Sequence, residues 1–253
     1  MSSTNASVHG NMWETLMPAI FIETFKTKPL FQWPLLPNNC IPEQLNGDVK
    51  IVGYSEQNPR LSITYNDVTL QEFLEAHLGN DKKIRSDYTP PFYFPSPNVT
   101  GPDVVFIIQI NNHTVPVFVQ TKLRQVVPLA DAVQAISTTS SKAVQGKIYK
   151  EEQQRNQKQI QDLCPSGMYI SMVIAYPAQV ISFQAFRPDP DPEIVGLERV
   201  VIKIDNNNFP KIFPKRHVEF LDQLKRFKRS AEDYVQPCQS KKANLRKTKT
   251  NDI

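Results

Sequence analysis

Glycine is scarce in this chain, with 8 residues among 253, whereas proline is frequent, with 21. So few glycines argue against glycine-rich phosphate-binding loops, and the sequence contains no Gly-x-x-x-x-Gly-Lys-Ser/Thr pattern. The many prolines indicate several extended connections between elements. The three cysteines, Cys40, Cys164 and Cys238, lie far apart, which excludes a disulfide framework and a cysteine-rich metal site. We therefore expect a reducing compartment.

Long hydrophobic runs are also missing. The most apolar stretch near the N-terminus, Met17 to Ile22, is far shorter than the roughly 20 residues that a membrane-spanning helix needs. No basic segment followed by a long apolar run is visible, so no secretory signal is predicted. We expect an intracellular protein without a membrane partner. The abrupt start, close to a predicted helix, leaves open that the sequence is a fragment of a longer chain.

Positive charge is concentrated near the C-terminus. Phe209 to Thr250 holds 12 Lys and Arg against 4 Asp and Glu, a net charge of +8, whereas the remainder holds 17 against 21, a net charge of −4. With 40% apolar residues the body can form a sizeable core. We predict one domain over residues 1–227 and a disordered basic tail over 228–253. A polyanion partner, a nuclear address and a merely solvated end all remain open for this tail.

Hydrophobic periodicity predicts alternating helices and strands. Helices are expected at 11–25, 70–78, 129–163 (two helices broken near 138–141) and 217–227, with a kink or a new start at Pro18. Strands are expected within 50–65 and at 103–111, 114–124, 167–176 and 199–205. A hairpin followed by a helical crossover and further strands indicates an α/β fold whose mixed central sheet is flanked by helices.

The hairpin predicted at 103–124 carries three polar residues that stand out. Asp103 opens its first strand, and Gln120 and Lys122 interrupt the apolar run of its second strand. Because side chains alternate along a strand, Gln120 and Lys122 share one face. Polar groups in a buried strand need partners or solvent, since leaving one unpaired costs roughly 1–3 kcal/mol. A polar cleft shared with Asp103 would satisfy them.

Such a cleft suits phosphodiester chemistry. Carboxylate and amide oxygens are ligands that Mg²⁺ accepts while it keeps several waters and contacts a phosphate. A lysine beside them can activate the attacking water or stabilise the charge of the pentavalent phosphorus.

These residues also resemble a known superfamily. Pro102-Asp103, followed 17 residues later by Gln120-x-Lys122, is similar to the PD-(D/E)XK signature of restriction-endonuclease-like nucleases. The resemblance implies an αβββαβ core, with an insertion at about 28–97 between the first helix and the motif hairpin. The sequence departs from the signature at Gln120, where the family pattern has an acid, so Gln120 supplies no negative charge.

Two further short matches accompany the signature. Gly10-Asn-Met-Trp13-Glu14 resembles the helix that carries another acid in this family, which makes Glu14 the candidate. Gln145-Gly-Lys-Ile-Tyr149 is similar to a Gln-x-x-x-Tyr helix motif and makes Gln145 and Tyr149 weaker candidates.

Within the superfamily the chain resembles the nuclease-like C-terminal regions of Crinkler effectors and related mobile-element-linked proteins of fungi and oomycetes. Phe118-Val-Gln120-Thr121-Lys122 is similar to their second motif strand, and the resemblance extends over about Gly10 to Asp205.

The resemblance implies Mg²⁺- or Mn²⁺-dependent hydrolysis of DNA, with RNA as the alternative substrate and the nucleus as the implied location. Asp103, Gln120 and Glu14 would bind the metal, and Lys122 would orient the water. Two alternatives stay open: the same fold acting without catalysis, as an effector or as a nucleic-acid- or protein-binding module, and an unrelated α/β interaction domain. Most candidates also have a plain structural interpretation: Asp103 as a turn residue, Lys122 as a strand end that extends its ammonium to solvent, and Glu14, Gln145 and Tyr149 as surface side chains.

Overall fold

The computed structural model describes residues 3–35, 41–57, 60–78, 89–95, 101–122, 124, 126–140, 164, 166–180 and 197–223, with the side chains of the first helix described from Thr15 onward. The chain divides into two compact units, Met1–Pro214 and Lys215–Ile253. Within the second unit, residues 215–223 are helical, where the sequence predicts a helix at 217–227. The basic tail predicted over 228–253 lies outside the described residues.

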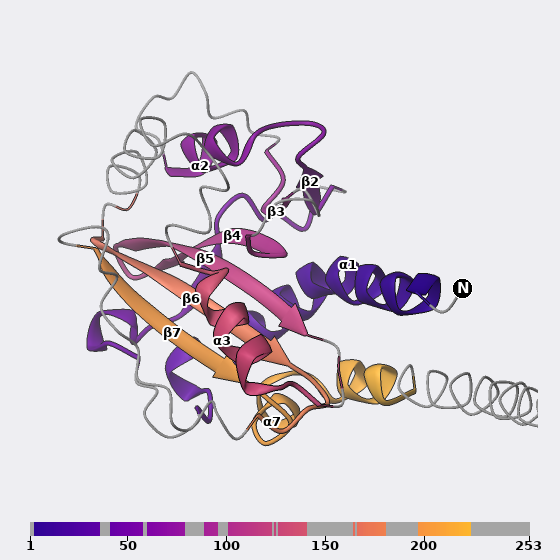
Figure 1. Ribbon diagram of the computed structural model, residues 1–253. Helices are drawn as coiled ribbons and strands as arrows, with labels where there is room; N and C mark the ends of the chain where they lie inside the picture. The colour runs from indigo at the N-terminus through magenta and orange to yellow at the C-terminus, as the bar shows by residue number, and fades with distance from the viewer. Residues whose placement is uncertain are drawn as a thin grey trace, which may run out of the picture. The chain divides into compact units, whose positions relative to one another are not determined.

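The first unit alternates helices and strands, as Figure 1 shows. The helices are α1 (Ser3–Thr27), α2 (Leu70–Leu78), α3 (Leu129–Ser137) and α7 (Phe209–Ile212), with short 3-10 turns at Leu30–Gln32 and Glu43–Leu45. The strands are β1 (Val49–Ile51), β2 (Ser62–Thr64), β3 (Phe92–Phe94), β4 (Val104–Ile110), β5 (His113–Lys122), β6 (Met168–Ala175) and β7 (Glu198–Ile204).

These strands form one mixed sheet in the order β2-β3-β4-β5-β6-β7, and β1 also pairs with β4. The pairs β1–β4, β3–β4 and β4–β5 are antiparallel, whereas β5–β6 and β6–β7 are parallel. The predicted α/β class with a mixed central sheet flanked by helices is therefore confirmed. The segment predicted as an insertion, 28–97, contributes three of these strands, so it forms one side of the sheet.

Helices cover both faces of the sheet. On one face, the ring of Phe21 in α1 lies 4.8 Å from that of Phe106 in β4, and Phe92 of β3 lies 5.1 Å from the same ring. On the other face, α2 packs through Phe73 against Tyr93, and α3 buries Ala132, Ala135 and Ile136 against β6 and β7 (Figure 1). Both faces are apolar because both are covered, as expected for strands with parallel neighbours.

Helix α1 differs from its prediction. It begins at Ser3 rather than near Asn11, and it runs through Pro18 as one α-helix, so of the two predicted outcomes at Pro18 the new helical start is wrong. Proline lacks the N–H that a helix interior uses and crowds the preceding turn. The buried side chains of Met17 and Phe21 on either side of the proline hold the helix against the sheet, and this tertiary packing outweighs the local penalty.

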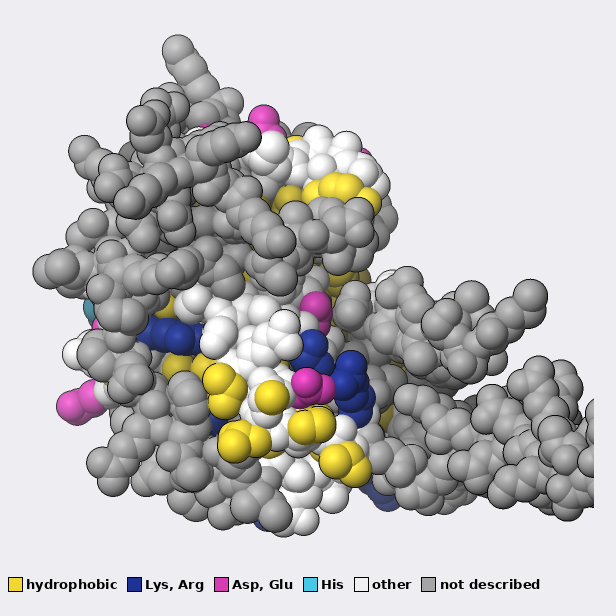
Figure 2. Space-filling view, viewed as in Figure 1, with side chains coloured by type: hydrophobic (Ala, Val, Ile, Leu, Met, Phe, Trp, Pro, Cys, Tyr) yellow, Lys and Arg dark blue, Asp and Glu magenta, His cyan; other side chains and the backbone are white. Residues whose placement is uncertain are grey.

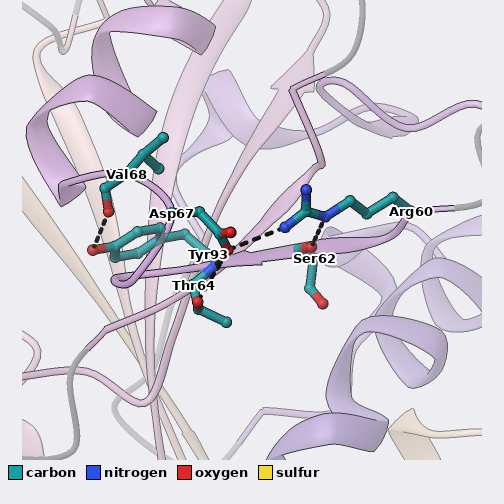
Figure 3. A network of polar contacts seen from close by, with 6 residues as sticks. All are labelled: Arg60, Ser62, Thr64, Asp67, Val68 and Tyr93. Carbon is teal, nitrogen blue, oxygen red and sulfur yellow. Dashed lines mark hydrogen bonds and ion pairs between the residues drawn. The ribbon is translucent and has the colours of Figure 1, made fainter.

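The connection from β2 to α2 is fixed by a surface network around Asp67 (Figure 3). The Asp67 carboxylate accepts hydrogen bonds from the Thr64 backbone N–H, the Thr64 hydroxyl and Arg60, each at 3.0 Å. These donors hold the pKa of Asp67 below its ordinary value. The Tyr93 hydroxyl donates to the Val68 carbonyl and ties the same turn to β3.

Candidate functional site

The β4–β5 hairpin brings Asp103 to Gln120. Its turn is at Asn111, whose positive φ of 53° is one that asparagine tolerates better than most residues. The register pairs Val104 with Val119, and the Asp103 N–H donates to the Val119 carbonyl at 2.7 Å, which continues the ladder to the start of β4. Asp103 thus lies beside the end of β5, where Gln120 and Lys122 face the same side of the sheet.

One carboxylate oxygen of Asp103 receives three hydrogen bonds. Its Oδ2 accepts from Gln120 Nε2 at 2.6 Å, from the Thr121 backbone N–H at 2.6 Å and from the Thr121 hydroxyl at 2.8 Å. Within the part of the chain that the structure describes, no hydrogen bond reaches the other oxygen, Oδ1. The three donors to Oδ2 therefore fix the direction of the carboxylate.

The charge of Asp103 is only partly compensated. Burial raises the pKa of this carboxyl, against the opposing effects of the Thr121 and Gln120 donors and of the Lys122 charge. Asp67 is an internal comparison, because it accepts the same pair of donors from a threonine, and yet its pKa is lowered on the exposed surface. The two aspartates differ in burial and in the Arg60 partner of Asp67, and burial makes the ionised form of Asp103 the less favourable of the two.

The Gln120 amide is held at both ends. Gln120 is only 5% exposed, its Nε2 donates to Asp103, and its Oε1 accepts from the Thr138 hydroxyl at 2.8 Å. A carboxylate cannot donate, so the chemistry of the pair fixes this orientation of the amide. The nitrogen of Gln120, rather than the oxygen that we expected as a metal ligand, faces Asp103 in this arrangement.

Lys122 ends β5 and is half-buried. Its carbonyl accepts hydrogen bonds from the backbone N–H groups of Arg124 and Tyr176, both at 3.1 Å, so the backbone is fixed from two directions. The positive charge of its ammonium acts to lower the pKa of Asp103. The two residues, both of which the structure describes, form no ion pair with each other. Lys122 therefore adds positive charge near the Asp103 carboxylate.

A single divalent cation fits this donor set. Asp103 Oδ1 is a hard oxygen that no hydrogen bond among the described residues reaches, and Mg²⁺ is commonly held by one or two carboxylates with several waters. The described residues contain no group of three or more His, Cys, Asp or Glu side chains placed to bind a metal. Water and a substrate phosphate would therefore have to supply most of the coordination sphere.

The other predicted site residues are not all described. Glu14 lies in α1, but the structure does not describe its side chain, and Gln145 and Tyr149 lie outside the described residues. Thr121 and Thr138 contact the site, although neither is among the site residues predicted from the sequence. Two sequence features could have indicated them. Thr121 lies between Gln120 and Lys122 in the motif, and Thr138 lies in the Ser/Thr patch that was predicted to break a helix.

The surface beside the site is apolar with a charged rim. Val126, Leu129 and Val133 are exposed on α3 and the segment before it, where Figure 2 shows apolar side chains gathered. Arg124 and Asp131 form an ion pair of 2.6 Å across the same segment. Lys122 thus borders an open surface rather than the sealed core.

No protein-family model, curated protein or solved structure matches the chain. No helix among the described residues is long and apolar enough to cross a membrane.

Proposed function

We propose that the protein hydrolyses phosphodiester bonds of DNA with the help of Mg²⁺ or Mn²⁺ bound at Asp103. The observation that carries the proposal is the meeting of Asp103, Gln120 and Lys122 at one end of the β4–β5 hairpin, with 2.6 Å between Gln120 Nε2 and Asp103 Oδ2.

The order of elements around the hairpin supports the proposal. Helix α1 precedes three antiparallel strands, β3, β4 and β5, and helix α3 then leads to β6, which is parallel to β5. This order agrees with the αβββαβ core that the sequence resemblance implies. On this interpretation β1, β2 and α2 are additions at one side of that core.

Each residue then has a defined task. Asp103 would hold the cation through Oδ1, and the two Thr121 donors would keep the carboxylate from rotating. A bound divalent cation supplies Lewis acidity to a phosphate oxygen and lowers the pKa of a bound water. Lys122 would hold a phosphate oxygen or the attacking water and offset the negative charge that develops during attack.

The substrate class follows from charge. The body of the protein is acidic, and the basic tail, which lies outside the described residues, would supply Lys and Arg contacts to phosphates. Binding should then weaken steeply as salt rises, because each neutralised phosphate releases counterions. RNA in place of DNA is an outcome that the same assay decides.

The test is cleavage by the purified full chain. We expect nicking of supercoiled plasmid with Mg²⁺ or Mn²⁺ and none with EDTA. Asp103→Ala and Lys122→Ala should abolish nicking, whereas Asp67→Ala and Lys50→Ala, which alter exposed residues of the same charges, should not. Cleavage that survives both site changes would refute the proposal.

A second candidate function is favoured by the orientation of Gln120. Its Nε2 already donates a hydrogen bond to Asp103 Oδ2, so hydrogen bonds alone can hold the two side chains together without any cation. The protein would then be a nuclease-like fold that binds nucleic acid or protein without catalysis. DNA binding that persists while calorimetry detects no Mg²⁺ or Mn²⁺ binding would select this candidate over the first.

A further inference from the structure

The buried amide of Gln120 has two close partners whose demands differ, and its nitrogen also makes a longer contact, 3.5 Å, with the Thr121 carbonyl oxygen. Its oxygen faces the Thr138 hydroxyl, and its nitrogen faces the Asp103 carboxylate. Turning the amide over by half a rotation would exchange the two atoms without moving any other side chain. Whether the turned state is accessible depends on what each partner can offer to the exchanged atom.

Thr138 can serve either orientation. Its Oγ1 lies 2.8 Å from Gln120 Oε1 and 2.8 Å from the Ala135 carbonyl oxygen. A hydroxyl has one proton to donate and can also accept. With the amide as it stands, the hydroxyl donates to Gln120. With the amide turned, it would accept from Nε2 and donate to the Ala135 carbonyl, so no polar group on this side is left unpaired.

Asp103 can serve only one orientation by itself. Its Oδ2 lies 2.6 Å from the amide nitrogen, and turning the amide would place an oxygen there instead. Two oxygen acceptors at that separation repel each other unless a positive charge lies between or beside them. A divalent cation on Asp103 supplies that charge, and the turned Gln120 oxygen would then point toward it.

We propose that Gln120 is a cation-responsive switch, in which Nε2 donates to Asp103 Oδ2 in the free protein and Oε1 turns toward a cation held at Oδ1 when the cation binds. The proposal rests on the proposed function, since it requires a cation at Asp103. It makes Thr138 a positioning residue, because its hydroxyl proton moves from the Gln120 oxygen to the Ala135 carbonyl as the amide turns.

The switch links the site to the end of α3. Thr138 is the C-cap residue of this helix, and its backbone N–H donates to carbonyls of the last turn. In the free state the Thr138 hydroxyl lies between two acceptors, Gln120 Oε1 and the Ala135 carbonyl oxygen. In the cation-bound state it would donate to the Ala135 carbonyl alone. Cation binding should therefore tighten the C-terminal turn of α3.

The direct test is NMR of the Gln120 side-chain amide in the full chain, titrated with Mg²⁺. The Gln120→Glu variant, which lacks this amide, assigns the signal. Without Mg²⁺ we expect nuclear Overhauser contacts from the amide protons to the Thr121 backbone N–H. With Mg²⁺ bound, as measured by calorimetry on the same sample, these contacts should give way to contacts with the Thr138 methyl group.

The possible outcomes separate the two proposals. Mg²⁺ binding with unchanged Thr121 contacts overturns the switch and leaves the proposed function standing. Absence of Mg²⁺ and Mn²⁺ binding overturns both.

Substitutions at Thr138 give an independent readout. A buried N–H without an acceptor is tolerated less well than a carbonyl oxygen without a donor, so Thr138→Val should penalise the turned state more. We expect Mg²⁺ binding to weaken roughly three- to tenfold in Thr138→Val and to recover in Thr138→Ser. The neighbouring Ser137→Ala, which removes a hydroxyl that contacts only its own helix, is the control. Equal affinity in Thr138→Val and the wild type would contradict the switch.

Discussion

Replacing Gln120 by glutamate tests how the site balances charge. The substitution keeps the shape of the side chain but exchanges the Nε2 donor, 2.6 Å from Asp103 Oδ2, for a second carboxylate oxygen. A lost hydrogen bond to a charged group costs about 1.5–3 kcal/mol. Two carboxylates about 4 Å apart repel by roughly 4 kcal/mol at an effective dielectric constant of ~20. Because the pair can relieve this by binding one proton, we expect a loss of about 2–4 kcal/mol in unfolding free energy at neutral pH.

Urea denaturation of Gln120→Glu in EDTA, and again with Mn²⁺, measures this loss. The variant should regain most of its stability when Mn²⁺ is added, or when the pH is lowered enough for the pair to share a proton. The control is Gln109→Glu, the same change at an exposed position of β4 that pairs with Lys50. A Gln120→Glu protein as stable as the wild type in EDTA would refute the contact between the amide and Asp103.

Three further predictions concern the supports of the site and the core. Thr121→Val removes one of the three donors to Asp103 and should cost about 1–2 kcal/mol in urea denaturation, whereas Thr114→Val on the same strand should cost less, and equal losses would contradict the proposed role. Phe106→Ala should cost about 3–5 kcal/mol, because this fully buried ring contacts α1 and β3, and a loss below 1 kcal/mol would contradict that packing. Cys164 should resist thiol reagents at pH 8 until the protein unfolds, since burial raises its pKa to about 12; labelling of the native protein, measured with the other two cysteines replaced by serine, would contradict this.

The central strands could be predicted from the sequence because their patterns are strong. The segments that became β4 and β6 are nearly continuous apolar runs, and those that became β5 and β7 have apolar centres, as strands buried on both faces need. Alternation along β5 was enough to place Gln120 and Lys122 on one face, and the hairpin register then brought Asp103 beside them. These inferences succeeded because they depend on local pattern and on one short turn.

What the sequence could not predict depends on contacts between distant parts of the chain. Helix α1 continues through Pro18 because its apolar side chains pack on a sheet formed by residues far from it in sequence. The orientation of the Gln120 amide depends on Asp103 and on Thr138, 17 and 18 residues away. No local pattern distinguishes an amide whose oxygen faces a carboxylate from one whose nitrogen does, because only the surrounding donors and acceptors decide it.

The account depends most on whether Asp103 binds a divalent cation. Calorimetric titration of the full chain with Mn²⁺ tests this most directly, with Asp103→Asn as the site variant and Asp67→Asn as the control at the exposed aspartate. The account predicts one Mn²⁺ site in the wild-type protein and in Asp67→Asn, and its loss in Asp103→Asn. Binding that is absent from the wild type, or unchanged in Asp103→Asn, would contradict it.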